Sequence, residues 1–329
     1  MKPAGKEAYL EKIADIINEN YDRHVKQVLF YRDGGSLSYT VETDRGPCFL
    51  RIVRPQLMDT ALQAVEIQLF LMQKKFPVPQ IISTAKGEPY IRQEEKGEPY
   101  LYILYEYIEG GDPSPEDMEQ AGELTGRLHQ CMETYGGALY ERDKYFFIDR
   151  YLDILRKKKY PRADAFEAYG NAVWEKVKQL PYGYCHGDLY RNNIYKASTG
   201  ELYVLDFDTS CRTFPVYDIA LFCNETDYFT FREDAMGKTA DMLERFLKGY
   251  QRYKRVSREE QEAVYDLLAV YHFQLQAIII EIYGPDCVDD AFLDNQLDWL
   301  LRWRAQCDAR RGQRTGNEEE PIKQQKENN

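Results

Sequence analysis

The spacing of apolar residues divides the chain into a strand-rich first third and a helical remainder. Leu10, Ile13 and Ile17 share one face of a helix predicted over 4–20. Apolar residues at helical spacing predict another helix near 62–72, which Pro77 ends. Five extended segments bounded by turn residues surround that helix, at 25–32, 37–42, 48–53, 89–93 and 100–107. This pattern predicts a five-stranded antiparallel sheet with one inserted helix.

The segment after residue 110 is predicted to be mainly helical. The sequence Ser-Pro-Glu-Asp at 114–117 is typical of a helix start, and Ser257 with Glu260 forms a capping box before a long helix. A short hairpin near 194–205 interrupts the helices. The fold class is therefore α+β, with a first lobe over 1–107 and a helical second lobe over 108–308. Residues 309–329 have no apolar periodicity, and we expect them to form a disordered tail.

Composition and charge restrict the classes of function. The formal net charge of −12 argues against binding nucleic acid through phosphate neutralisation. The seven cysteines show no spacing typical of a metal site or of a disulfide framework. The most apolar stretch, 267–283, contains His272 and Glu281, so it predicts a buried helix and no membrane span. With no signal sequence apparent at the start, we expect a cytoplasmic protein in a reducing environment.

A group of polar residues near position 190 carries the chemistry. His186, Gly187 and Asp188 form a tight turn, Asn193 follows five residues after Asp188, and Asp206 comes after the next hairpin. Phosphoryl transfer requires a group that orients the acceptor hydroxyl and oxygen ligands for Mg²⁺. An Asp and an Asn on one loop, with a second Asp on the adjacent hairpin, can supply both.

This pattern, H-G-D-x4-N followed by an apolar strand and D-x-D, resembles the aminoglycoside phosphotransferase, choline kinase and homoserine kinase superfamily over about 25–300. The resemblance implies a bilobal protein-kinase-like fold and a kinase that uses Mg²⁺ and ATP or GTP. It implies that Asp188 is the catalytic base and that Asn193 and Asp206 hold Mg²⁺. The remaining implied roles are metal support for Asp208 and support of the catalytic loop for His186 and Asp218.

The first lobe offers candidate groups for the nucleotide's phosphates. Gly34, Gly35 and Ser36 form a small-residue turn between the first two strands, where backbone N–H groups can approach phosphate closely. Arg51 on the third strand is a candidate phosphate-binding cation, in a place where most kinases have Lys. We expect Glu66 of the inserted helix to hold Arg51, although an ordinary surface ion pair would give the same pattern.

The segment 101–110 resembles the family's connection between the two lobes. Backbone groups of Glu106, Tyr107 and Ile108 are therefore expected to meet the edge of the base. His129, on the first helix of the second lobe, is expected to be a packing residue.

The acceptor is a hydroxyl of a small molecule, and several classes fit. Acidic residues could bind an aminoglycoside, whereas aromatic residues could form a cage for choline. An amino alcohol, a homoserine-like compound or a sugar is equally compatible. The sequence around 206–218 is also similar to the spore-coat-associated branch of the superfamily. A kinase-fold protein that binds without catalysis is the main alternative, and a metal-dependent hydrolase or a protein kinase is less well supported.

Overall fold

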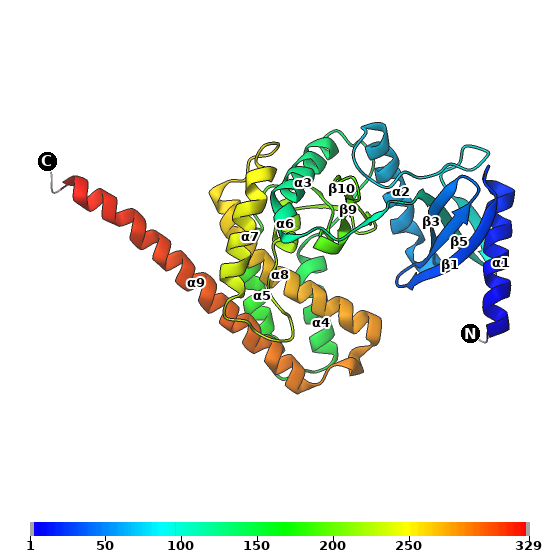
Figure 1. Cartoon of the computed structure of the whole chain (residues 1–329). Coiled ribbons are helices and arrows are strands. Elements are labelled where there is room, and N and C mark those ends of the chain that lie inside the picture. Colours follow the sequence, from blue (N-terminus) through cyan, green and yellow to red (C-terminus); the bar gives the residue numbers. More distant parts are fainter. Residues whose placement is uncertain (1–2, 96, 327–329) are drawn as a thin grey trace. The chain divides into compact units, whose positions relative to one another are not determined.

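The computed structural model describes residues 3–95 and 97–326, and these form two compact units (Figure 1). The first unit contains the chain up to residue 117, with 130–139 and 190–210. The second contains 118–129, 140–189 and the chain from 211 onward. This division differs from the single boundary predicted after residue 107, because the segments 108–117 and 190–210 group with the sheet-rich unit.

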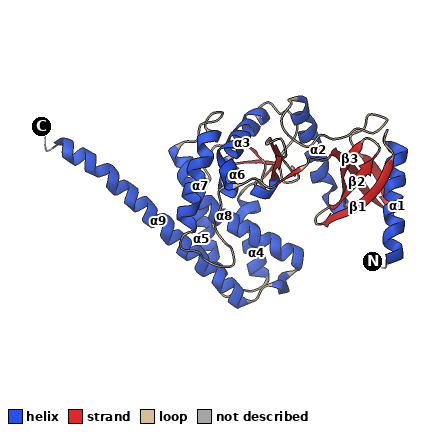
Figure 2. Ribbon diagram, in the orientation of Figure 1, coloured by secondary structure: helices blue, strands red, loops and turns tan. Residues whose placement is uncertain are grey.

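The first unit contains the predicted five-stranded antiparallel sheet (Figure 2). Its spatial order is β1-β2-β3-β5-β4. The strands are β1 (Val25–Asp33), β2 (Leu37–Thr43), β3 (Gly46–Val53), β4 (Ile91–Glu95) and β5 (Glu98–Glu106). The predicted helices are present as α1 (Pro3–Asn20) and α2 (Met58–Gln73), the latter after a short 3₁₀ turn.

Side-chain alternation directs the two faces of this sheet to different helices. On β3, Leu50 and Ile52 pack with Ile13 and Ile17 of α1. The opposite face packs against α2, where Val65 belongs to the same apolar cluster as Val53 and Ile103. Because successive side chains of a strand point to opposite faces, Arg51 lies on the α2 side, where it pairs in register with Ile103.

A second sheet of the same unit carries the predicted hairpin. It has the order β10-β9-β6, formed by β10 (Leu202–Val204), β9 (Ile194–Ala197) and β6 (Gly110–Gly111). At Gly110 a Cβ atom would lie 2.0 Å from the Lys196 carbonyl oxygen, so only glycine allows this pairing. The Gly-Gly pair that interrupts the sequence pattern is therefore a short strand, which joins 108–117 to the hairpin.

The second unit is mainly helical. A small sheet of order β7-β11-β8 is formed by β7 (Tyr140–Glu141), β11 (Cys211–Thr213) and β8 (Gly183–Cys185). The helices are α3 (Met118–Met132, whose last turn belongs to the first unit), α4 (Arg150–Lys157), α5 (Ala163–Val177), α6 (Val216–Phe222), α7 (Ala235–Tyr250), α8 (Arg258–Tyr283) and α9 (Asp290–Lys326).

Helix α8 is the core of the second unit. It starts at the predicted capping box, in which the Ser257 side chain accepts a hydrogen bond from the Glu260 amide. It packs against α4, α5 and α6. Among the described residues α8 alone is long and apolar enough to cross a membrane, and 83% of its apolar window is buried inside the protein. That burial fits the predicted core helix.

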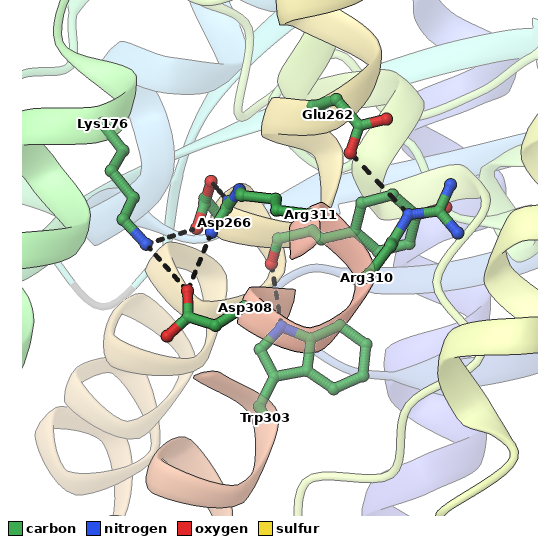
Figure 3. A network of polar contacts seen from close by, with 8 residues as sticks. Lys176, Glu262, Asp266, Trp303, Asp308, Arg310 and Arg311 are labelled. Carbon is green, nitrogen blue, oxygen red and sulfur yellow. Dashed lines mark hydrogen bonds and ion pairs between the residues drawn. The ribbon is translucent and has the colours of Figure 1, made fainter. Parts of the chain in front are cut away.

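Helix α9 is held against its neighbours by a network of charged residues (Figure 3). Arg311 pairs with Asp266 of α8, and Lys176 of α5 lies 3.7 Å from both Asp266 and Asp308. The indole of Trp303 donates to the Tyr265 carbonyl oxygen at 2.8 Å. Helix α9 extends through Lys326, whereas the sequence predicts a disordered tail from 309.

Candidate active site

The loop that carries Asp188 is anchored by one fully buried carboxylate. Asp218, at the start of α6, accepts hydrogen bonds from the backbone amides of His186 at 2.6 Å and Gly187 at 2.9 Å. The Cys185 thiol donates to the same carboxylate at 3.0 Å. Gly187 adopts φ of 81°, which a residue with a side chain rarely takes. The loop conformation that precedes Asp188 is therefore specified by Asp218 and Gly187, while Asp188 itself is partly exposed.

His129 holds Asp218 in turn. Its Nε2 lies 3.0 Å from the Asp218 carboxylate and its Nδ1 lies 2.7 Å from the Tyr250 hydroxyl. Burial alone would raise the pKa of Asp218, but the hydrogen bond and charge of His129 outweigh burial and lower that pKa. Asp218 is therefore ionised in the folded protein at neutral pH. His129 is thus a buried packing residue with both ring nitrogens satisfied, as the sequence predicts, and the structure adds that it positions the loop anchor.

Close packing of α3 and α7 brings Tyr250 to His129. At Gly249 a Cβ atom would lie 1.8 Å from the Glu119 carbonyl oxygen. Only a glycine permits this approach, so the backbone of α7 lies directly against α3. The chain of contacts from Gly249 through Tyr250 and His129 to Asp218 lies within the second unit.

Asn193 and Asp206, the expected metal ligands, are joined through the backbone of the first unit. The amide of Leu205 donates to the Asn193 carbonyl oxygen at 2.9 Å, which places Asp206 one residue from that bond. Asp206 has φ of 58°, in the left-handed region that costs a non-glycine residue about 1–3 kcal/mol. Strain of this kind clusters at functional sites. The amide and carboxylate oxygens present here are ligands that Mg²⁺ accepts along with phosphate oxygens.

Arg51 is bound by Asp208, and not by Glu66 as the sequence led us to expect. Nη1 of Arg51 donates to Oδ1 of Asp208 at 2.8 Å, and Nη2 donates to Oδ2. Burial would lower the pKa of Arg51, but the hydrogen bonds and charge of Asp208 outweigh burial and raise that pKa. Glu66 is exposed on α2. Gln63, one turn earlier, is buried and donates to the Ser210 carbonyl oxygen at 2.8 Å.

The turn between β1 and β2 is held by two arginines. Nε of Arg51 donates to the Ser36 hydroxyl at 3.1 Å. Arg54 donates to the carbonyl oxygens of Gly34 at 2.5 Å and Gly35 at 3.0 Å. Because Arg54 binds the carbonyl groups of Gly34 and Gly35, the turn is a candidate for covering the phosphates. Arg54, three residues after Arg51, is not among the residues predicted from the sequence.

The connection after β5 has fewer free backbone groups than expected. The amide of Glu106 donates to the Gln80 carbonyl oxygen at 2.9 Å, so it is not available to a base. A cavity of about 260 Å³ adjoins Glu106, Tyr107 and Ile108 within the first unit. Tyr107 is 42% exposed. The backbone groups of Tyr107 and Ile108 remain the candidates for contacting the base.

A larger cavity, of about 370 Å³, lies in the second unit. Its lining comes from one segment of the chain, residues 224–229, together with Arg232. Tyr228 packs on Tyr271 with ring centroids 5.3 Å apart. Asp227 accepts bonds from the amides of two following residues, Phe229 and Thr230, and pairs with Arg232 at 3.4 Å. Tyr217 and Phe222, two aromatic residues of α6, are fully buried.

These features agree with comparisons to known proteins. The family model described as the phosphotransferase enzyme family matches residues 29–260, and the chain belongs to this family. The match includes Arg51, Asp188, Asn193, Asp206 and Asp218. The predicted family is thereby confirmed, and with it membership among kinase-type phosphotransferases.

Solved structures of small-molecule kinases share the fold. The amicoumacin kinase hAmiN, solved with AMP-PNP and Ca²⁺, is 19% identical with a TM-score of 0.70, covering 93% of this chain and 96% of its own. A microcompartment-associated aminopropanol kinase is 15% identical with a TM-score of 0.68, covering 91% and 96%. A choline/ethanolamine kinase family protein from Mesorhizobium loti is 17% identical with a TM-score of 0.58, covering 93% and 94%. The predicted α+β, protein-kinase-like fold is confirmed.

Proposed function

We propose that this protein is a Mg²⁺-dependent phosphotransferase that moves the γ-phosphate of ATP or GTP to a hydroxyl of a small molecule. The observation that carries the proposal is the anchored loop. Asp218 fixes the backbone of His186 and Gly187, the two residues that precede Asp188. A general base must be held in place by its surroundings, because misplacement by 1 Å can cost about 100-fold in rate. The anchor gives Asp188 that support.

In this proposal Asp188 orients the acceptor hydroxyl and accepts its proton. The carboxylate lies on a loop whose backbone is specified on one side by Asp218. Four residues separate Asp188 from Asn193, so one short segment of the chain carries the base and one proposed metal ligand. His186 is fully buried, and its backbone amide donates a hydrogen bond to the Asp218 carboxylate. We assign His186 to support of the loop and not to proton transfer.

Asn193 and Asp206 would hold Mg²⁺. The oxygen donors fit this ion, and the backbone bond from Leu205 to Asn193 keeps the two residues in neighbouring segments. When bound, the ion would neutralise charge on the triphosphate. The strained backbone at Asp206 fits a carboxylate whose direction matters for function.

The acceptor is proposed to bind in the second unit, where the cavity of about 370 Å³ has the size of a small-molecule site. Glu225, Asp227 and Tyr228 are among its lining residues. Carboxylate and phenol groups suit an acceptor that carries an amine beside its hydroxyl. Amino alcohols and aminoglycosides are therefore the first acceptors to examine, followed by homoserine-like compounds and sugars.

The test is a nucleotide-consumption screen with Mg-ATP and Mg-GTP against these acceptor classes. We expect acceptor-dependent turnover and a phosphorylated product detectable by mass spectrometry. The Asp188→Asn variant serves as the control, since it keeps the size of the side chain and removes the base. Thermal stabilisation by Mg-nucleotide without turnover on any acceptor would favour the non-catalytic alternative. Failure of wild-type protein to bind either nucleotide would refute the proposal.

A further inference from the structure

We propose that Asp208 positions Arg51 for the phosphates of the nucleotide and is not a metal ligand. This inference rests on the proposed function and assigns a residue within it. It replaces two expectations from the sequence, namely that Glu66 holds the cation and that Asp208 supports the metal. The geometry around Arg51 in the first unit, which contains both Arg51 and Asp208, supports this role.

Both oxygens of the Asp208 carboxylate are bound by the guanidinium. Nη1 of Arg51 donates to Oδ1 at 2.8 Å and Nη2 donates to Oδ2. Such two-point pairs are stronger and more directional than single hydrogen bonds. Each side chain is 16% exposed, so water screens the pair weakly. A carboxylate held in this way is committed to its arginine.

Arg51 nevertheless keeps donors for a phosphate. A guanidinium has five N–H groups, and three of them are used by Ser36 and Asp208. Of the other two, one can be taken by the hydrogen bond between Arg51 and the Tyr105 side chain, which leaves at least one N–H group for a phosphate oxygen. Arg51 can therefore hold Asp208 and bind a phosphate oxygen at the same time. The planar fork makes this possible, whereas a lysine ammonium has only three donors at one point.

The turn that carries Asp208 is itself fixed to α2. Gln63 donates to the Ser210 carbonyl oxygen at 2.8 Å, and the Ser210 amide donates to the Phe207 carbonyl oxygen at 3.0 Å. Helix α2 thus holds the backbone of the turn through Gln63, and the carboxylate of Asp208 in that turn binds Arg51. Asp206 lies in the same turn as Asp208. One short segment therefore carries both a proposed metal ligand and the acid that holds Arg51.

A double-mutant cycle on nucleotide affinity tests this role. Asp208→Asn and Arg51→Gln are each expected to raise the KM for nucleotide by about 10- to 100-fold, the cost of a hydrogen bond to a charged group. If Asp208 acts through Arg51, Asp208→Asn changes KM by less than about 3-fold in the Arg51→Gln background. The Mg²⁺ concentration for half-maximal activity is expected to stay within about 2-fold of wild type in Asp208→Asn.

Two further variants protect the test against loss of folding. Arg51→Lys with Asp208→Glu combines a shorter cation with a longer acid, and we expect it to bind nucleotide better than either single variant. Asp117→Asn removes the partner of Lys196, another partly buried ion pair of the same unit. It is expected to lower stability and leave nucleotide KM unchanged.

The outcomes separate this inference from the proposed function. With active wild-type protein, a raised Mg²⁺ requirement in Asp208→Asn, or an undiminished effect in the Arg51→Gln background, would make Asp208 a metal ligand and overturn the inference alone. Absence of nucleotide binding by wild-type protein would overturn the proposed function, and the inference with it.

Discussion

Replacing Asp218 by Asn removes the charge that organises the catalytic loop without changing the size of the side chain. The carboxylate accepts from the amide of Gly187 on Oδ1 and from the amide of His186 on Oδ2. An asparagine has one acceptor oxygen and one NH₂ group, so one of the two backbone amides must face another donor. His129 also loses the carboxylate that its Nε2 contacts and keeps only the Tyr250 hydroxyl on Nδ1.

The expected cost follows from the complete burial of this group. Asp218 is 0% exposed and His129 is 1% exposed. A buried backbone N–H group that loses its acceptor costs about 1–3 kcal/mol, because it stays desolvated and unpaired. We expect a loss of about that size in the free energy of unfolding. We also expect kcat to fall by at least about 10-fold, because the loop before Asp188 loses its specified conformation.

Urea unfolding at pH 7 and steady-state turnover at a temperature where the variant is folded measure the two effects. Asp266→Asn is the matched control, because Asp266 is also a nearly buried acid of the second unit and pairs with Arg311 far along the chain. It should lose stability and keep kcat. Asp153→Asn, at an exposed pair with Arg156, should change stability by less than about 0.5 kcal/mol. A change below about 1 kcal/mol in Asp218→Asn, or an unchanged kcat, would refute the anchoring argument.

Two further predictions concern the helical unit. His272 is buried against Trp299, and burial lowers the pKa of His272 to about 3. Below about pH 6.5 the unfolded chain binds a proton at this imidazole and the folded chain does not. The free energy of unfolding therefore decreases as the pH decreases, by about 2 kcal/mol between pH 6.5 and pH 5. His272→Phe should remove that part of the pH dependence in urea titrations, and an unchanged slope would contradict it. Gly249→Ala should cost about 1–3 kcal/mol through overpacking against Glu119. Gly237→Ala, on the same helix with open space around it, should be neutral or stabilising by calorimetry.

Local patterns in the sequence were sufficient for most of the fold. Three patterns illustrate this: the alternation of β3, the helical spacing of α2 and the capping box at Ser257. Each indicates which side of a segment is buried or where a segment begins. The H-G-D motif also indicated which residues to examine for chemistry. Such signals depend on residues a few positions apart, and the sequence displays them directly.

Partners far apart along the chain were not visible in the sequence. Arg51 and Asp208 are 157 positions apart, and His129 and Asp218 are 89 apart. Periodicity predicts the face on which a side chain lies but not the side chain that meets it. The inserted helix predicts Glu66 as the partner of Arg51, and the structure shows Asp208 in that place. The contacts of Arg310 and Arg311 with α8 were missed for the same reason.

The most direct test compares wild-type protein with Asp188→Asn in both nucleotide binding and phosphoryl transfer. Nucleotide binding is measured by calorimetry with a non-hydrolysable Mg-nucleotide, and transfer is measured by mass spectrometry of the acceptor identified in the screen. We predict equal dissociation constants within about 2-fold and a loss of transfer of at least about 100-fold, the smaller end of a general base's contribution. Transfer by Asp188→Asn at the wild-type rate would contradict the assignment of Asp188 as the catalytic base.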